Sequence, residues 1–224
     1  MARLPRLALA GHTHYVIQRG HGSPAGRGVF ADEVDRRTFL VALRDAAAGG
    51  QVQVHGYALL QDEVQLLATP AEGAALGRLM QALGRRYVSA YNRRHGHRGS
   101  LWDGRFRCAV VEPGPSRLAV LQLIDGQSAE PGVTSAGPHS GGARESLLVD
   151  PPELWSLGNT PFEREAAYRG LLAQGLAPAE AAALRRAALG GWVAGSPAFV
   201  AQVAEVAARP ARPRSPGRPR STHR

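Results

Sequence analysis

The stretch that decides the fold is Tyr57-Ala-Leu-Leu-Gln-Asp-Glu-Val-Gln-Leu-Leu-Ala-Thr-Pro70. Two short apolar runs flank a polar Gln-Asp-Glu corner, which is the pattern of two strands paired as a hairpin. Successive side chains of a strand point to opposite faces, so we expect Glu63 and Gln65 on one face and Val64 on the other. Two such oxygen-bearing side chains either form half of a divalent-cation site or line a solvated strand face. The residues alone favour the solvated face.

The size and composition of the chain indicate a globular protein. It has 224 residues, of which 44% are hydrophobic, enough to bury a sizeable core. It contains no run of about 20 apolar residues, so we expect no membrane span, and its N-terminal apolar stretch is too short for a secretion signal. The single cysteine, Cys108, allows no internal disulfide and suits a reducing cytoplasm, where we expect the protein to reside.

The charge of the chain is its most informative bulk property. The net charge is +9 and the pI is about 11.0, which predicts a polyanionic partner such as nucleic acid. All 27 basic side chains are arginines, and a guanidinium offers a bidentate fork to phosphate and a plane that stacks on bases.

The order of the expected elements predicts an α+β fold. We expect strands over 12–18, 52–60, 63–69 and 108–111, and helices from Asp32 to Gly49-Gly50, over 74–94 and over 116–125. The order strand, helix, strand, strand, helix, strand is that of a ferredoxin-like antiparallel sheet with helices packed on it.

The rest of the chain divides into three parts. Residues 126–150 are rich in glycine, proline and serine and are predicted to be a flexible linker. Residues 151–208 are predicted to form a small helical module, with helices over 161–174, 177–189 and 196–208. Residues 209–224 carry six arginines and no acid, which predicts a disordered basic tail.

Several arginines and one tryptophan are candidates for contact with nucleic acid. Four arginines fall on one stripe of the helix over 74–94, which is either a phosphate-binding face or a solvated face, and the two interpretations are about equal. The loop over 95–107 mixes glycine, arginine and aromatic residues, a composition that suits a single strand. The candidates are Arg78, Arg85, Arg86, Arg93, Arg94, Trp102, Arg105, Arg107, Arg218 and Arg220.

Taken together, several stretches resemble the IS200-like single-tyrosine (HUH) transposases, in particular the subgroup associated with repetitive extragenic palindromes (REP). The matching stretches are residues 9–20, 32–43, 57–70, 79–88, 91–96 and 101–107. The resemblance covers most of residues 1–125 and implies a domain of that type there. It also implies DNA transposition, by metal-dependent nicking and joining of single-stranded DNA at hairpins.

The resemblance further implies a set of catalytic residues that this chain lacks. Active relatives hold Mg²⁺ or another divalent ion between two histidines, and these positions fall on Glu63 and Gln65. The position of the nucleophilic tyrosine falls on Leu123, and only Gln127 keeps a residue type that binds metal. We therefore expect a catalytically degenerate relative that still binds single-stranded or hairpin DNA.

Two alternatives stay open at this point. A residual nuclease would need an oxygen site built from Glu63, Gln65 and Gln127, which would bind Mg²⁺ weakly, and a borrowed nucleophile such as Tyr87 or Tyr91. A decaying gene copy would have no selected function. The sequence does not indicate the DNA sequence bound or the oligomeric state.

Overall fold

The structure is a computed structural model of the chain and describes residues 6–21, 28–127, 134–207 and 209–213. The strands are β1 (Thr13–Arg19), β2 (Val52–Leu60), β3 (Glu63–Pro70), β4 (Arg107–Val111) and β5 (Val193–Ala194). The helices are α1 (Glu33–Gly50), α2 (Ala75–His95), α3 (Pro115–Asp125), α4 (Ala136–His139), α5 (Pro152–Trp155), α6 (Pro161–Gln174), α7 (Pro178–Gly190) and α8 (Pro197–Val206).

The first four strands have the predicted ferredoxin-like topology. They lie in the order β2-β3-β1-β4, and every neighbouring pair among them is antiparallel. Together with the element order, this arrangement confirms the α+β fold. The sequence did not predict β5, which extends the sheet parallel to β4 and makes the complete sheet mixed.

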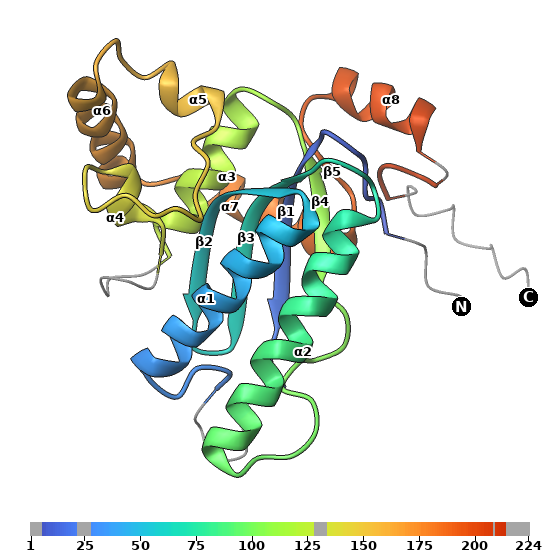
Figure 1. Ribbon diagram of the computed structural model, residues 1–224. Coiled ribbons are helices and arrows are strands. Elements are labelled where there is room, and N and C mark those ends of the chain that lie inside the picture. The colour runs from blue at the N-terminus through green and yellow to red at the C-terminus, as the bar shows by residue number, and fades with distance from the viewer. Residues whose placement is uncertain (1–5, 22–27, 128–133, 208, 214–224) are drawn as a thin grey trace, which may run out of the picture.

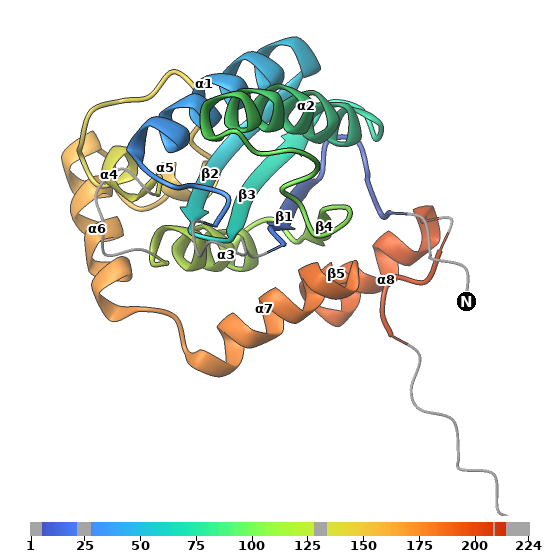
Figure 2. The same cartoon turned by 90° about the horizontal axis from the view of Figure 1, so that it is seen from below.

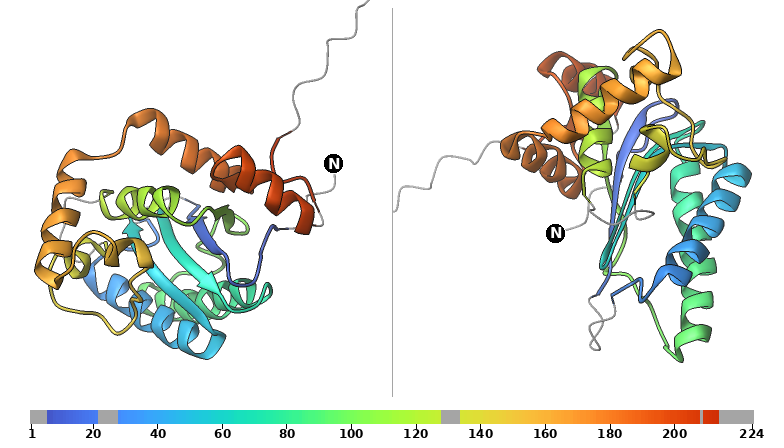
Figure 3. Two further views of the ribbon diagram at one scale, coloured as in Figure 1. Left: turned by 90° about the horizontal axis from the view of Figure 1, so that it is seen from above. Right: turned by 90° about the vertical axis from the view of Figure 1, so that its left-hand side faces the viewer.

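Helices cover both faces of the sheet. Figures 1 and 2 show α1 and α2 on one face and α3 and α7 on the other, and Figure 3 shows the sheet edge-on between them. Phe39 and Tyr87 belong to the first core, together with Val64 of β3. Ile17 of β1 and Leu184 of α7 belong to the second. Successive side chains of each strand therefore alternate between two separate hydrophobic cores.

The helix ends follow local capping chemistry. Asp32, where the sequence predicts the helix to begin, is the N-cap of α1: its side chain accepts hydrogen bonds from two backbone amides of the first turn, at 3.0 and 3.1 Å. The predicted stop at Gly49-Gly50 is displaced, because both glycines stay helical and Gln51 takes the left-handed conformation with φ 53°. Helix α2 lies within one residue of its predicted bounds and ends at Gly96 with φ 63°.

The segment predicted to be a flexible linker is packed where the structure describes it. Residues 128–133 lie outside the described residues. Beyond them, Ser135 is fully buried and donates a 2.5 Å hydrogen bond to the carboxylate of Asp125. The backbone N–H of Val149 donates to β2 at 2.9 Å. Ser135 and Val149 thus attach the described part of this segment to α3 and β2; its role as a linker remains a prediction.

The C-terminal helices are part of the same packed body. Helix α6 begins where the sequence predicts a helix, and Thr160 and Glu163 form a capping box at its start. Helix α7 packs against β4 and β1, and β5 pairs with β4. The division into domains over 1–125 and 151–208 remains a prediction. Residues 214–224, most of the predicted basic tail, lie outside the described residues.

None of the helices in the described part of the chain has the length and apolar character that a membrane crossing requires.

Candidate nucleic-acid interface

The polar pair on β3 lies on the sheet face covered by α3 and α7. Glu63 pairs with Arg19, and Gln65 pairs with Ile17, in the antiparallel register of β1 and β3. The amide of Gln65 donates a 2.7 Å hydrogen bond to the Glu63 carboxylate. Val64 belongs to the opposite core. The predicted division of these three residues between the two faces is confirmed.

An arginine of α7 forms an ion pair with the Glu63 carboxylate. The Arg185 guanidinium donates two hydrogen bonds to it, at 2.8 and 3.0 Å, and Arg19 donates a third at 3.2 Å. Burial raises the pKa of Glu63, but the hydrogen bonds and charge of Arg185 outweigh burial and lower it below its ordinary value. The position that the resemblance assigns to a metal ligand thus holds a fixed ion pair.

Gln65, the other residue of the polar pair, is also hydrogen-bonded within the protein. Gln65 and Tyr15 are both 0% exposed, and the Tyr15 hydroxyl donates a 2.6 Å hydrogen bond to the Gln65 carbonyl oxygen. The Gln65 amide therefore donates to Glu63 and accepts from Tyr15, which satisfies it within the protein. Within the described ranges, no group of three or more His, Cys, Asp or Glu side chains is arranged to hold a metal ion.

The resemblance singles out two positions near the end of α3, Leu123 and Gln127. Leu123 is 7% exposed and belongs to the second core. Gln127 lies just beyond α3, and its side-chain amide donates to the Leu123 carbonyl in the last turn of that helix at 3.0 Å.

The tyrosines that could stand in for a nucleophile are structural. The Tyr87 hydroxyl donates to the carbonyl of Val29 and the Tyr91 hydroxyl to that of Gly28. Tyr15, which sequence reasoning did not consider, lies beside Gln65 but is fully buried, and burial raises its pKa. A buried, neutral phenol is a weak nucleophile and would need a neighbouring base or metal to activate it.

A basic groove borders this ion pair. We call it the arginine groove; it has a volume of about 430 Å³, and Asp103 is the acidic residue among the described residues that line it. Arg19 lines the groove and also contacts Glu63. The groove therefore begins where the resemblance places the catalytic centre. Its arginines are Arg6, Arg19, Arg105, Arg107 and Arg209.

The arginine groove is built from both ends of the described chain and from the predicted loop. The Arg6 guanidinium lies 3.8 Å from the centre of the Phe106 ring, and that of Arg209 lies 5.1 Å from the Trp192 ring. Burial, and next the charge of Arg105, lower the pKa of Arg6. Cations that repel one another in this way create a site that a bound anion stabilises.

Only some of the predicted nucleic-acid contacts that the structure describes lie in the arginine groove. Arg105 and Arg107 are exposed and line the arginine groove. The contacts predicted from the sequence do not include Arg6, Arg19 or Arg185, and they include Arg209 only as part of the basic tail. The sequence does not distinguish these arginines from the others, because the residues that they contact lie far away along the chain. Arg185, for example, is 122 residues from Glu63.

The arginines of α2 lie with the helix layer on the other side of the sheet. Three of them are paired with carboxylates: Arg78 with Glu72 at 2.7 Å, Arg86 with Asp45 at 2.9 Å, and Arg94 with Asp32 and Asp35 at 2.5 and 2.6 Å. Arg85 and Arg93 are exposed and have no acidic partner among the described residues.

The remaining predicted contacts are differently placed. Trp102 is half-buried, and its ring lies 6.4 Å from Phe39 and 6.2 Å from Tyr87, which attaches it to the first core. Arg218 and Arg220 lie outside the described residues.

Comparison with known proteins gives a likeness of fold. No family model matches the chain, and no curated protein matches it. One similar solved structure is a REP-associated tyrosine transposase bound to a REP hairpin, with 12% identity, 56% of this chain and 71% of that chain covered, and a TM-score of 0.47. Another is a protein of Deinococcus radiodurans R1 assigned as a transposase by prediction, with 24% identity, coverage of 58% and 100%, and a TM-score of 0.38. Values this low say nothing of activity.

Proposed function

We propose that this chain is a non-catalytic nucleic-acid-binding protein of the IS200-like transposase type. The observation that carries the proposal is the arginine groove, which lies beside a carboxylate already neutralised by Arg185. Among the described residues, five arginines line the groove against one acidic residue, Asp103. Such an excess of positive charge attracts the phosphates of a nucleic acid and releases its counterions.

The ion pair explains why the same site would bind without cutting. Metal-dependent nicking needs a cation that polarises the scissile phosphate and a nucleophile that attacks it. Here the Glu63 carboxylate is taken by two arginines and Gln65, and the position of the tyrosine is Leu123 in the core. Residual nuclease activity would require these contacts of Glu63 to break first.

The ligand class comes from the sequence resemblance, which implies single-stranded or hairpin DNA. Arg105 and Arg107 are the strongest candidates for phosphate contacts, because they are exposed in the arginine groove. Contacts from the α2 arginines and from Arg218 and Arg220 remain predictions. A groove of this size fits a single backbone better than a duplex about 20 Å across.

The proposal is tested by titrating a fluorescent DNA hairpin with single-stranded flanks at several salt concentrations. Arg105→Ala and Arg107→Ala should each weaken binding and lower the slope of log K against log salt by about 1. Arg44→Ala is the matched control, because Arg44 is an exposed arginine of α1 in the other helix layer. Equal effects in the groove variants and the control would contradict the assignment.

A further inference from the structure

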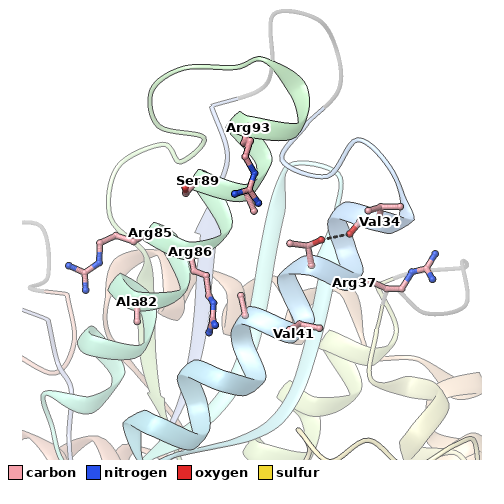
Figure 4. A pocket seen from close by; sticks show the side chains of 11 residues that line it. Val34, Arg37, Val41, Ala82, Arg85, Arg86, Ser89 and Arg93 are labelled. Carbon is pink, nitrogen blue, oxygen red and sulfur yellow. Dashed lines mark hydrogen bonds between the residues drawn. The ribbon is translucent and has the colours of Figure 1, made fainter.

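A second groove lies between α1 and α2, over their outer surfaces. It is open to solvent and has a volume of about 980 Å³. Figure 4 shows the two helices side by side, with side chains that line the groove on both; Arg85 and Arg37 extend outward from the far sides of their helices. We call it the helix groove. None of the described residues that line it also lines the arginine groove, so the inference below does not depend on the proposed function.

The floor of the helix groove is apolar at positions where solvent-facing helices are usually polar. Val34 and Val41 are 47% and 48% exposed. They are seven residues apart and therefore lie on one stripe of α1. A β-branched residue lowers helix propensity, so helix formation alone does not explain two valines there. On the α2 side, Ala82 and Ala90 also line the groove, and such small side chains leave room for another element to approach.

The charges around this floor are all positive among the described residues that line it. Figure 4 shows Arg85 and Arg37 at opposite edges of the view, with Arg86 and Arg93 between them. Arg37 and Arg86 have acidic partners on α1, at 3.6 and 2.9 Å. Arg85 and Arg93 have none in the described part of the chain, so they are available to an acidic ligand.

We propose that the helix groove binds an acidic amphipathic helix of a partner protein. Such a helix would lay leucine-like side chains on Val34 and Val41 and present carboxylates to Arg85 and Arg93. This is the helix-in-groove mode of recognition, in which anchors recur every third or fourth residue. The lining residues of α2 run from Ala82 to Arg93, about three helical turns at 1.5 Å per residue, which matches a short helix.

The apolar floor is the reason to favour a protein helix over a nucleic acid. A phosphate backbone would satisfy the arginines but would leave the valines against charged, hydrated groups, with no gain from burial. An amphipathic helix satisfies both features at once, since it has an apolar stripe flanked by charged residues. Duplex DNA is therefore the alternative occupant that the experiment must distinguish.

The test uses the full chain and two labelled synthetic peptides of about 20 residues. Both have leucine at every third or fourth position; one has glutamate at the flanking positions and the other lysine. The acidic peptide should bind saturably in fluorescence anisotropy, and at least about tenfold more tightly than the basic one. Equal binding of the two peptides, or no saturable binding of the acidic one, would overturn the proposal.

Substitutions in the helix groove show whether the peptide binds there. The double change Val34→Glu and Val41→Glu should weaken the acidic peptide at least about tenfold, and so should Arg85→Ala with Arg93→Ala. Ala48→Glu is the matched control, because it adds a carboxylate at an exposed position of α1 that does not line the helix groove. The four substituted residues of the groove are exposed, and circular dichroism checks that the variants are folded. Unchanged affinity in the groove variants, or displacement of the peptide by unlabelled duplex DNA, would reject a protein helix as the occupant.

Discussion

At the scale of single residues, Glu63 and Arg185 decide what the candidate site does. An exposed carboxylate on β3 would be free to bind a cation, but the carboxylate of this chain is 12% exposed and accepts from two guanidiniums. The hydrogen bonds and charge of Glu63 raise the pKa of Arg185, so the pair stays ionised. A buried ion pair of this kind is costly to break from one side, because the partner is left without its counter-charge.

Arg185→Met should therefore lower the free energy of unfolding by about 2 kcal/mol, a value reduced for the partial exposure of Arg185 and for the remaining contact with Arg19. The matched control is Arg186→Met, which removes the neighbouring exposed arginine of α7 and should change stability by less than about 0.5 kcal/mol. Urea unfolding measures both. Equal losses in the two variants would mean that the ion pair contributes nothing of its own.

A second prediction at this scale concerns His14, which is fully buried on β1. Burial lowers its pKa to about 4, and its Nε2 accepts a 3.2 Å hydrogen bond from the backbone N–H of Leu9. Between the ordinary pKa of 6.5 and this value, the unfolded chain binds a proton that the folded protein does not. His14 thus contributes stability above pH 6.5, and up to about 3 kcal/mol is lost as the pH falls to 4.

Unfolding at a series of pH values measures this loss. His14→Met should flatten the pH dependence in that window, whereas His21→Met, at an exposed position, should keep that of the wild type. If His14→Met and the wild type lose stability in parallel, other groups are responsible for the pH dependence.

At the scale of elements, the start of α1 is joined to the end of α2. Asp35 is 2% exposed and accepts from Arg94 at 2.6 Å and from His95 at 2.9 Å. Both ends of this contact also suit the helix dipoles, since carboxylates lie at an N-terminus and cations at a C-terminus. The same contact uses Arg94, which the sequence predicts to bind nucleic acid.

Asp35→Ala should cost about 2 kcal/mol of stability, because it leaves two cationic or polar partners without their acceptor. Asp45→Ala on the same helix removes an exposed carboxylate and should cost less than about 0.5 kcal/mol. Thermal or urea unfolding compares the two. A loss in Asp45→Ala as large as that in Asp35→Ala would show that burial of the carboxylate does not matter.

The elements also show how far the sequence predicts the structure. Strand alternation placed Glu63 and Gln65 on one face, and the N-cap at Asp32 located the start of α1. Local patterns failed where the partner is distant: β5 has only two residues and is defined by its pairing with β4. In the same way, nothing near Arg185 indicates that it reaches Glu63.

At the scale of the whole molecule, the C-terminal part closes the second face of the sheet. Tyr15, Ile17 and Ala109 belong to a core that also contains Leu184 of α7 and Tyr168 of α6. Helix α3 also belongs to this core, but without α6 and α7 the part of the core that those two helices cover would be in water. The Glu63 carboxylate would also lose Arg185. The second face therefore depends on the segment that the sequence divides off as a separate module.

The full chain should unfold in a single cooperative transition, and a chain that ends at Gln127 should bind a hydrophobic dye and lose that transition. Differential scanning fluorimetry and dye fluorescence compare the two. A truncated chain that melts as cooperatively as the full one would show that residues 1–125 form a self-sufficient domain. Loss of a cooperative transition in the full chain would instead support a decayed gene product.

The central claim is that this molecule binds DNA and does not cut it. The most direct measurement incubates the full chain with DNA hairpins labelled at either end, with Mg²⁺ or Mn²⁺, and analyses the same samples on native and denaturing gels. We expect a salt-sensitive complex on the native gel, and on the denaturing gel only DNA of the original length. A shortened strand, or DNA that stays covalently attached to re-purified protein, would contradict the account, and so would the absence of any complex at low salt.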